Sequence, residues 1–473
     1  MMEIPCGMQE QFLEAKQLIE SSKDIKIYTH TDCDGICSGA ILSIILDRLN
    51  KDYEIEFVNL DEIEDLDLDH KLTIFSDLGS GQGVDKNAKD GQKILILDHH
   101  PPLRDINYKN DKAYTYLEIN PMFYGIDGSY YVCGGGLCYF LAKTFGFKDL
   151  SWIGVLSAIG DMQNNKTGHF EGLNEIIQED AINEGLLKVT KNDLNIYGRS
   201  TRPLYVALSY FSDVKLPTTN NQQEAKVVLE ELGVDEKHNR KTLSEVTEED
   251  KMEIKKFLSR MISKRVPPKY LKYVPKLIVG DAYTFLNEEE GSFLRDGSEF
   301  STAMNACGRN RKEAIGVDII KGDRLVALDA LEEVSKTHKY NLATSISKVA
   351  DNYHSEIIEL DNFQYFDCSD FDEDIASNII GTITGMVLGY CNWKKPILGF
   401  SKPKNNQIKV SLRCSKLLAY DGIHFGNMIR EIAKEVGGTG GGHAIACGAY
   451  IPNEKKSEFL DKFNRKLQGK IAN

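Results

Sequence analysis

Polar residues recur directly after short β-rich runs in the first hundred residues. The runs IKIYT, EIEFVNL, LTIFSD and KILILD begin at residues 25, 54, 72 and 93, and helical patterns cover residues 35–50 and, more briefly, the stretch near residues 82–90. Alternation of this kind predicts a mostly parallel, doubly wound α/β sheet with helices on both faces. Because ligands bind outside the carboxyl ends of such strands, the residues that follow the runs are the first candidates for a site.

Three regions of the chain differ in pattern. Residues 1–180 carry the alternation and include helical patterns near residues 136–144 and 152–159. Residues 181–353 contain long charged helical stretches, and residues 354–473 return to β-rich runs. A length of 473 residues fits two or three domains at roughly 150 residues each. We therefore expect an N-terminal α/β domain, a largely helical insertion and connecting region, and a smaller C-terminal α/β domain.

The composition narrows the class of protein. Hydrophobic residues make up 41% of the chain and charged residues 27%, and 12 residues are proline, which is typical of a globular protein and not of a disordered chain. The longest apolar stretches, such as residues 379–391, are shorter than the roughly 20 residues that cross a bilayer. The N-terminal segment has acids where a signal peptide has basic residues. We expect a cytoplasmic protein with no membrane span, whose 10 cysteines stay reduced because none forms a C-x-x-C pair.

The first polar group follows the first β-rich run. In THTDCDG, His30, Asp32 and Asp34 occupy alternate positions, and Gly35 opens the next helical pattern. Alternate residues of an extended segment point to the same side, so these three side chains are expected to share one face. Taken alone, the segment is more typical of an Asp-Gly turn with a helix-capping acid.

Three further polar groups stand in comparable positions. Asp77 ends the run LTIFSD, and Asp98, His99 and His100 follow at the end of KILILD. Asp161 follows a glycine at the end of an apolar helical pattern, SAIGDMQ. Each group by itself is typical of a turn or a cap. Parallel strands, however, bring their carboxyl ends to one edge of a sheet, so the groups together predict a single site.

Such a site concentrates negative charge. Its carboxylates would repel one another in a partly dry crevice unless cations neutralised them or their pKa values rose. Mixed Asp and His ligands suit Mn²⁺ or Mg²⁺, and the imidazoles favour Mn²⁺. Two divalent ions about 3.5–4 Å apart can share a carboxylate, activate a water and stabilise the displacement at a phosphate. The sequence therefore predicts two divalent metal ions, with Mn²⁺ preferred and Mg²⁺ possible, and phosphoester hydrolysis.

These motifs resemble those of the DHH phosphoesterase superfamily, which match HTDCDG at residues 30–35, Asp77, DHH at residues 98–100 and GD at residues 160–161. The resemblance implies a first metal held by His30, Asp32 and Asp77. It implies a second metal held by Asp34, Asp77, His99 and Asp161, so that Asp77 bridges the two. It further implies that Asp98 fixes a neighbouring imidazole and that His100 faces the scissile phosphate.

A glycine-dense segment lies near the C-terminus. GGTGGGH, residues 437–443, precedes the β-rich run AIACGAYIP. Such a turn can bring backbone N–H groups and an imidazole close to an anion, although a flexible hairpin is equally typical of it. The resemblance extends here, because the DHH-associated C-terminal domain carries a GGGH segment and an upstream S-x-R pattern, matched by Ser411 and Arg413. It implies a cleft between the terminal domains in which substrate phosphates are bound by Arg413, Gly441, Gly442 and His443.

The combination of domains favours one branch of the superfamily. Inorganic pyrophosphatases and exopolyphosphatases have a different C-terminal domain without GGGH, whereas the middle segments GRSTRPLYVALSYF and FLRDGSEFSTAMNACGRNRKE resemble those of archaeal RecJ-like exonucleases. The resemblance implies an exonuclease that hydrolyses single-stranded DNA or RNA to nucleoside 5′-monophosphates, in replication, repair or RNA processing. Ten further residues are candidates for contacts to a nucleic-acid strand, with ordinary surface pairing or core packing as the alternative. They are Arg199, Arg202, Arg295, Arg309, Arg311, Tyr114, Tyr116, Tyr124, Tyr130 and Tyr131.

Two other functions stay open at this point. NanoRNases and cyclic-dinucleotide phosphodiesterases share both terminal domains, although they are usually compact. A replication scaffold is a function of another class, because the superfamily includes a degenerate helicase-associated member and archaeal relatives bind the GINS complex. The motifs are complete in this chain, so scaffolding would be an additional role.

The net charge of −14 is distributed unevenly. Residues 1–180 contain 15 Lys and Arg against 31 Asp and Glu, whereas residues 391–473 contain 15 against 6. The acidic excess lies with the predicted metal ligands, and the basic excess lies with the predicted phosphate-binding residues. We therefore expect salt-sensitive binding of a polyanion despite the negative total.

Overall fold

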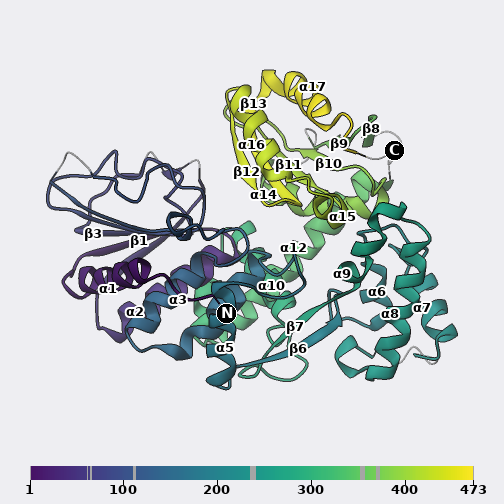
Figure 1. Cartoon of the computed structure of the whole chain (residues 1–473), viewed down its shortest axis with the longest axis horizontal. Coiled ribbons are helices and arrows are strands. Elements are labelled where there is room, and N and C mark those ends of the chain that lie inside the picture. The colour runs from purple at the N-terminus through teal and green to yellow at the C-terminus, as the bar shows by residue number, and fades with distance from the viewer. Residues whose placement is uncertain are drawn as a thin grey trace. The chain divides into compact units, whose positions relative to one another are not determined.

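The chain forms two compact units, each built from two separate stretches of sequence (Figure 1). The computed structural model describes residues 2–60, 62–63, 66–109, 113–234, 241–351, 357–368 and 373–471, with the backbone alone at residues 350–351 and 373–378. Unit 1 comprises Met1–Asn192 and Asp281–Ser335, and unit 2 comprises Asp193–Gly280 and Lys336–Asn473. The predicted middle region, residues 181–353, therefore contributes to both units.

Unit 1 contains a five-stranded sheet with the order β2-β1-β3-β4-β5, in which every neighbouring pair is parallel. The strands are β1 (Ile25–His30), β2 (Tyr53–Val58), β3 (Leu72–Ser76), β4 (Lys93–Leu97) and β5 (Thr115–Ile119). The first four coincide with the predicted β-rich runs, and β5 adds a strand that was not predicted. The predicted parallel N-terminal sheet is confirmed.

Helices cover one face of this sheet. Apolar side chains that alternate along the strands, such as Ile27, Ile74 and Leu95, join one core with helices on that side. Figure 1 shows α1, α2 and α3 below β1 and β3. The core includes α1 (Cys6–Glu20), α2 (Cys33–Arg48), α3 (Gly134–Thr144), α4 (Ser151–Gly160) and α5 (Leu173–Asn183), and helical residues further along the chain, such as Phe300 and Ile319, also join it.

The opposite face of the sheet is covered by turns in the described residues rather than by the predicted helices. Tyr28, Phe75 and Ile96 pack there with residues of the segment between β3 and β4, including Val84 and Ala88. The helix predicted near residues 82–90 is wrong, because backbone bonds there close single turns, such as Lys86 N to Gly83 O and Ala88 N to Asp85 O, each 3.1 Å. Three glycines between residues 81 and 91 disfavour a continuous helix.

The middle region is mostly helical, as predicted. Its two strands, β6 (Leu187–Leu194) and β7 (Val279–Phe285), form a separate two-stranded sheet. The 26-residue α12 begins in the stretch assigned to unit 1 and ends in that assigned to unit 2. The helices of the region are α6 (Leu204–Ser209), α7 (Gln222–Glu231), α8 (Glu248–Ser263), α9 (Val274–Ile278), α10 (Gly297–Arg309), α11 (Glu313–Ile320) and α12 (Val326–Asp351).

Unit 2 contains a six-stranded sheet with the order β12-β13-β11-β10-β9-β8. The β9–β10 pair is parallel and the other pairs are antiparallel. The strands are β8 (Ile357–Glu359), β9 (Gln364–Asp367), β10 (Ile397–Phe400), β11 (Gln407–Arg413), β12 (Thr439–Gly442) and β13 (Ala446–Pro452). The helices beside them are α14 (Glu373–Val387), α15 (Lys416–Tyr420), α16 (Phe425–Glu435) and α17 (Lys456–Leu467).

Strand β11 separates two environments in unit 2. Val410 and Leu412 point into a core that includes residues of α16 and α17. Ser411 and Arg413 alternate with them and lie against α14 at Gly381. The predicted C-terminal α/β domain is confirmed, and its S-x-R residues both face one helix.

The glycine-dense segment is mainly a strand rather than the expected turn. Residues 439–442 pair with β13 as edge strand β12, and the chain reverses after His443, whose N–H donates to Ala446 O at 2.9 Å. Gly442 has a φ of 118°, which favours glycine. A Cβ on Gly426 of α16 would lie 1.9 Å from Gly442 O, so glycines let the helix contact this strand directly.

Among the described residues, the structure has no helix long and apolar enough to cross a membrane.

Candidate metal centre

The carboxyl ends of β1, β3 and β4 carry most of the predicted site residues. His30 is the last residue of β1, Asp77 follows β3 directly, and Asp98 follows β4 directly. The chain continues from β1 to β2 on one side and from β3 to β4 on the other, so β1 and β3 flank the point where the strand order reverses. Ligands of open α/β sheets bind at such a point.

An outer group consists of His30, Asp32 and Asp77, whose ligand atoms lie within 4.8 Å of one another. His30 Nδ1 is 3.1 Å from Asp32 Oδ2 and 3.6 Å from Asp77 Oδ2. Asp32 caps α2 by accepting from Gly35 N at 3.1 Å, and a Cβ on Gly35 would lie 2.0 Å from His30 O. The side chains of His30 and Asp32 are 24% and 45% exposed, so this group reaches solvent.

An inner group consists of Asp34, His99 and Asp161, which meet the same 4.8 Å criterion. Asp34 is buried in the first turn of α2. Its two carboxylate oxygens accept from Gly134 N and Gly135 N, each at 2.8 Å, and Ser157 Oγ donates to one of them. The N-terminus of α3 thus holds this carboxylate through backbone amides, where a helix favours negative charge.

His99 presents one ring nitrogen to the carboxylates. Its Nδ1 donates to Gly128 O at 2.7 Å, because a carbonyl can only accept. In the neutral ring, Nε2 then carries the lone pair, and it lies 3.2 Å from Asp77 Oδ1 and 3.6 Å from Asp34 Oδ2. This is the usual arrangement of a histidine that binds a metal.

Asp77 belongs to the outer group and also faces the inner one. It is buried, and neither of its carboxylate oxygens accepts a hydrogen bond from the residues that the structure describes. Its oxygens face His99 on one side and His30 on the other. A buried carboxylate without donors is costly, and a cation shared by both groups would satisfy it.

The pKa values of the cluster show an excess of negative charge. Burial, together with Asp34 and Asp32, raises the pKa of Asp77 well above its ordinary value. Burial and Asp161 raise the pKa of Asp34. Burial acts against the charged form of His30, but Asp32 and Asp77 outweigh it and raise the pKa of that imidazole. The carboxylate and imidazole donors therefore fit divalent cations, which would displace these protons.

Asp98 holds the last histidine of the motif. Its Oδ1 accepts from His100 Nδ1 at 2.7 Å and from His99 N at 2.8 Å, and its Oδ2 accepts from Ser80 N at 2.9 Å. Burial alone would raise the pKa of Asp98, but His100 and the other donors hold this pKa below its ordinary value. The His100 side chain is 43% exposed. Asp98 thus orients an accessible imidazole beside the two groups.

Several contacts of this centre were not predicted. Asn120, at the end of β5, donates to His100 O at 2.8 Å and to Ser80 Oγ at 2.9 Å. Asn305 of α10 accepts from Cys33 N at 3.1 Å, although it is 272 residues away. The glycine run at residues 134–136 was a local signal for the cradle around Asp34, but a residue such as Asn305 leaves no local signal.

Some of the residues considered as contacts to a nucleic-acid strand have structural roles. Tyr114 is buried and donates to Asp85 Oδ2 at 2.7 Å. Arg199 lies 2.5 Å from the buried Asp193. Tyr130 has the Lys166 ammonium 4.4 Å from its ring centroid. Arg309 and Arg311 lie at the end of α10 in unit 1. A Cβ on the neighbouring Gly308 would lie 1.7 Å from Thr31 O, so these arginines stay candidates beside the centre.

The predicted phosphate-binding residues all belong to unit 2. Arg413 Nη1 donates to Leu412 O at 2.8 Å, and no described carboxylate lies within ion-pair distance of it. Burial lowers the pKa of this guanidinium. Gly441, Gly442 and His443 lie at the β12 end of the same sheet. Arg430 of α16, which was not predicted, lies beside Gly441: a Cβ there would be 3.0 Å from Arg430 Nη2.

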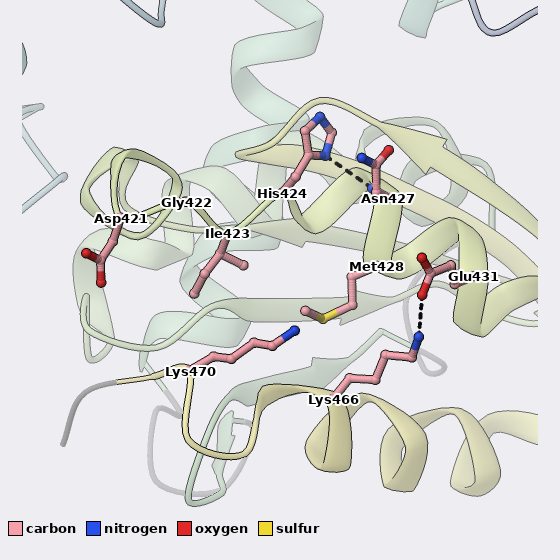
Figure 2. A pocket seen from close by; sticks show the side chains of 9 residues that line it. All are labelled: Asp421, Gly422, Ile423, His424, Asn427, Met428, Glu431, Lys466 and Lys470. Atoms are coloured by element: carbon pink, nitrogen blue, oxygen red, sulfur yellow. Dashed lines mark hydrogen bonds and ion pairs between the residues drawn. The ribbon is translucent and has the colours of Figure 1, made fainter.

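Unit 2 also has a cavity of about 400 Å³ between the 421–424 turn, α16 and α17 (Figure 2). Lys466 is paired with Glu431 there, and His424 Nδ1 accepts from Asn427 N at 3.2 Å. No predicted site residue lines this cavity, and its charges are mixed in sign. The clustered carboxylates and imidazoles of unit 1 are therefore the better candidate for a catalytic centre.

Three family models match the chain in order. They are the N-terminal domain of the DHH family at residues 24–155, the DHH-CID domain at residues 196–274 and the DHHA1 domain at residues 361–469. The uncharacterized protein MJ0831 of Methanocaldococcus jannaschii is 30% identical over 471 residues, which covers 96% of this chain and 98% of that protein. A second uncharacterized protein of this organism, MJ1071, is 30% identical over 190 residues, covering 39% of this chain and 54% of that protein.

Solved structures share the fold at low sequence identity. CDC45 from Entamoeba histolytica is 14% identical with a TM-score of 0.61, over 98% of this chain and 99% of that chain. RecJ in complex with Mn²⁺ from Thermus thermophilus is 12% identical with a TM-score of 0.55, over 99% of this chain and 55% of that chain. A structure of exonuclease RecJ bound to manganese is 12% identical with a TM-score of 0.51, over 98% and 96%.

The match to the N-terminal domain of the DHH family covers β1, β3 and β4, the strands that carry the centre. The fold is that of DHH-family phosphoesterases, and Asp and His residues that could hold a metal gather at the carboxyl ends of its strands. The chain belongs to the DHH superfamily and is a RecJ-like member of it.

Proposed function

We propose that this protein is a metal-dependent exonuclease that hydrolyses single-stranded DNA or RNA and releases nucleoside 5′-monophosphates. The observation that carries the proposal is the pair of Asp and His groups beside Asp77, a buried carboxylate that faces His30 of one group and His99 of the other. Both RecJ structures that share the fold contain Mn²⁺, and one of them is named as an exonuclease. This supports the same chemistry here.

The outer group, His30, Asp32 and Asp77, would hold one divalent ion. The inner group, Asp34, His99 and Asp161, would hold the second together with Asp77. Mn²⁺ is preferred because each group combines an imidazole with carboxylates, and Mg²⁺ would also bind. When bound, such ions lower the pKa of water and offset the charge of a phosphate undergoing displacement.

The residues of the chain supply positioning. Asp98 holds His100 through Nδ1, so the opposite ring edge of this half-exposed imidazole is available to contact the scissile phosphate. Arg413, Gly441, Gly442 and His443 would bind substrate phosphates. Arg413 suits this role because it lacks a carboxylate partner among the described residues, and a phosphate would supply the missing negative charge.

The charge distribution supports a polyanionic substrate. The segment of residues 391–473, which contains Arg413 and Arg430, has 15 Lys and Arg against 6 Asp and Glu. Each phosphate neutralised by such residues releases counterions, so binding weakens as salt rises. A nanoRNase or a cyclic-dinucleotide phosphodiesterase would use the same centre on a much shorter substrate.

The test is the digestion of single-stranded DNA and RNA of about 30 nucleotides, labelled at either end, with Mn²⁺ or Mg²⁺. Release of mononucleotides is expected, and the labelled end that is lost first gives the polarity. Asp34→Ala is the matched inactive control, with its thermal unfolding compared with wild type. Full activity of Asp34→Ala, or cleavage of a dinucleotide only, would contradict the exonuclease.

A second function is favoured by the likeness to CDC45, whose TM-score of 0.61 exceeds those of the two RecJ structures above. In this case the chain would be a scaffold in replication that binds a GINS complex. Co-purification of the wild-type chain and Asp34→Ala with such a complex tests the idea. Retention of the complex by both proteins, without nuclease activity in either, would support the scaffold and exclude the exonuclease.

A further inference from the structure

Gln163 contacts the ligand residues of the inner group without belonging to it. The residue is 2% exposed and follows Asp161 by two positions. Its Nε2 donates to Asp161 Oδ2 at 2.8 Å and to Gly128 O at 2.7 Å. Both hydrogens of this amide group are therefore used, one on a ligand and one on a carbonyl.

The same carbonyl fixes a second ligand. Gly128 O also accepts from His99 Nδ1 at 2.7 Å, so its two lone pairs serve His99 and Gln163. This bond sets which nitrogen of His99 carries the proton, and it points Nε2 at the carboxylates of Asp34 and Asp77. One glutamine amide thus connects Asp161 and His99 through hydrogen bonds.

Asn174 of α5 sets the orientation of the Gln163 amide. Its Nδ2 donates to Gln163 Oε1 at 2.6 Å, which is possible only if the oxygen of Gln163 points at α5 and its nitrogen points at Gly128 and Asp161. Asn174 is 1% exposed, and its backbone N–H donates to Tyr131 O at 2.9 Å. A flipped Gln163 would leave buried donors and acceptors unpaired, which is costly.

The outer group has fewer supports among the described residues, where Asp32 accepts from Gly35 N at 3.1 Å. Its His30 and Asp32 side chains are 24% and 45% exposed, whereas those of His99 and Asp161 are 3% and 10% exposed. In the inner group, Asp34 is held by two backbone amides and Ser157, His99 by Gly128, and Asp161 by Gln163. Ligands fixed before a metal binds lose less freedom when it does.

We propose that Gln163, oriented by Asn174, is a positioning residue that makes the inner group the tighter of two unequal metal sites. The inference rests on the proposed metal-dependent function, since it assigns different affinities to the two groups. Outer-shell partners of this kind typically change metal affinity by roughly 10–100-fold.

The experiment is a Mn²⁺ titration of the full chain without nucleic acid, followed by the electron paramagnetic resonance of free Mn²⁺. Wild type should bind in two classes of different affinity. Asp161→Asn should remove the tighter class and Asp32→Asn the weaker one, which assigns the classes to the groups. Gln163→Leu should then weaken the tighter class by roughly 10–100-fold and leave the weaker class unchanged.

Two further variants separate positioning from folding. Asn174→Asp keeps the size of the side chain but removes the donor to Gln163 Oε1, so it should weaken the same class. Gln178→Leu replaces another buried glutamine, on α5, which is outside this network, and should change neither class. Thermal unfolding of each variant checks that the fold is retained.

The outcomes are distinguishable from those of the proposed function. An unchanged tighter class in a folded Gln163→Leu, with Asp161→Asn still removing it, would overturn the inference and leave the exonuclease intact. Two Mn²⁺ classes that respond as expected in a protein that degrades no strand would support the inference and overturn the exonuclease. A wild type that binds no Mn²⁺ would overturn both.

Discussion

The candidate sites of the two units carry charge of opposite sign that the hydrogen bonds and ion pairs of the described residues do not fully satisfy. In unit 1, Asp77 is a buried carboxylate without a donor among the described residues, and burial with the nearby Asp34 raises its pKa. In unit 2, Arg413 has no described carboxylate within ion-pair distance, and burial lowers the pKa of its guanidinium. Each unit thus carries a charge that a ligand of opposite sign would satisfy: a cation in unit 1 and an anion in unit 2.

The core of unit 2 gives the contrasting case. Asp193 is as deeply buried as Asp77, but it lies 2.5 Å from Arg199 and 3.2 Å from Lys251. Burial alone would raise the pKa of Asp193, but these cations hold this pKa below its ordinary value. Removal of one partner from a buried ion pair leaves an uncompensated charge and destabilises the fold, whereas a buried charge that the fold satisfies incompletely is a candidate for a binding site.

The largest effect is expected from Asp77→Asn. If Asp77 holds both metal ions as proposed, loss of its carboxylate should lower kcat/KM at least about 10³-fold, since it removes several kcal/mol of stabilisation of the transition state. The metal-free variant should unfold at the same temperature as wild type or higher, because the substitution relieves the repulsion with Asp34 and Asp32 that raises the pKa of Asp77. Mononucleotide release and thermal unfolding in EDTA measure the two effects. A metal-free variant that unfolds well below wild type would place Asp77 with Asp193 as a structural residue.

Asp193→Asn should lower the stability and leave the activity unchanged, which is the reverse of Asp77→Asn. It removes the buried carboxylate that Arg199 and Lys251 share and leaves Lys251 paired with Glu248, so the free energy of unfolding should fall by about 3–5 kcal/mol, while the folded variant keeps its activity. Urea unfolding at pH 7 measures the loss.

The pH dependence follows from the lowered pKa of Asp193. The pair stabilises wild type fully above the unfolded-state pKa of about 3.9, and this contribution is lost as the pH falls through the folded-state value. The difference in unfolding free energy between wild type and Asp193→Asn should therefore shrink at acidic pH. A constant difference from pH 7 to pH 3 would show that the ion pair is not its source.

Arg413→Met tests the unpaired charge of unit 2. Loss of a charge-assisted bond to phosphate should raise KM about 10–100-fold, corresponding to about 1.5–3 kcal/mol, and should reduce the salt dependence of binding. Mn²⁺ affinity and the free energy of unfolding should not fall. Kinetics at two salt concentrations, with Lys409→Met of the same strand as a control, provide the measurement. An unchanged KM would remove Arg413 from the substrate site.

Ser157→Ala should have the smallest effect. Asp34 would keep the amides of Gly134 and Gly135 and lose only one donor, so Mn²⁺ affinity should fall about fivefold, or about 1 kcal/mol. The Mn²⁺ titration described above detects such a change in the tighter class. An effect as large as that of Asp161→Asn would mean that the amides contribute less than the hydroxyl.

The fold and the centre were predictable where chemistry is local. Strands β1, β3 and β4 follow from apolar runs, and His30, Asp77 and Asp98 stand out because each ends or directly follows one of them. Parallel packing then brings them to one edge. The missed strand β5 lies in AYTYLEIN, where polar residues interrupt the run, and the wrong helix near residues 82–90 has a helical composition broken by glycines.

The sequence by itself determined the candidate ligands, the parallel sheet and the family, because strand periodicity and motif spacing are local properties of the chain. Only the tertiary structure decided that Asp34 is held by the N-terminus of α3, that Asp77 is left without a donor, and that Gln163 connects Asp161 to His99. These features depend on contacts between residues as far apart as Asn305 and Cys33. Whether a charged side chain is paired or unpaired depends on such distant partners, and no local pattern carries that information.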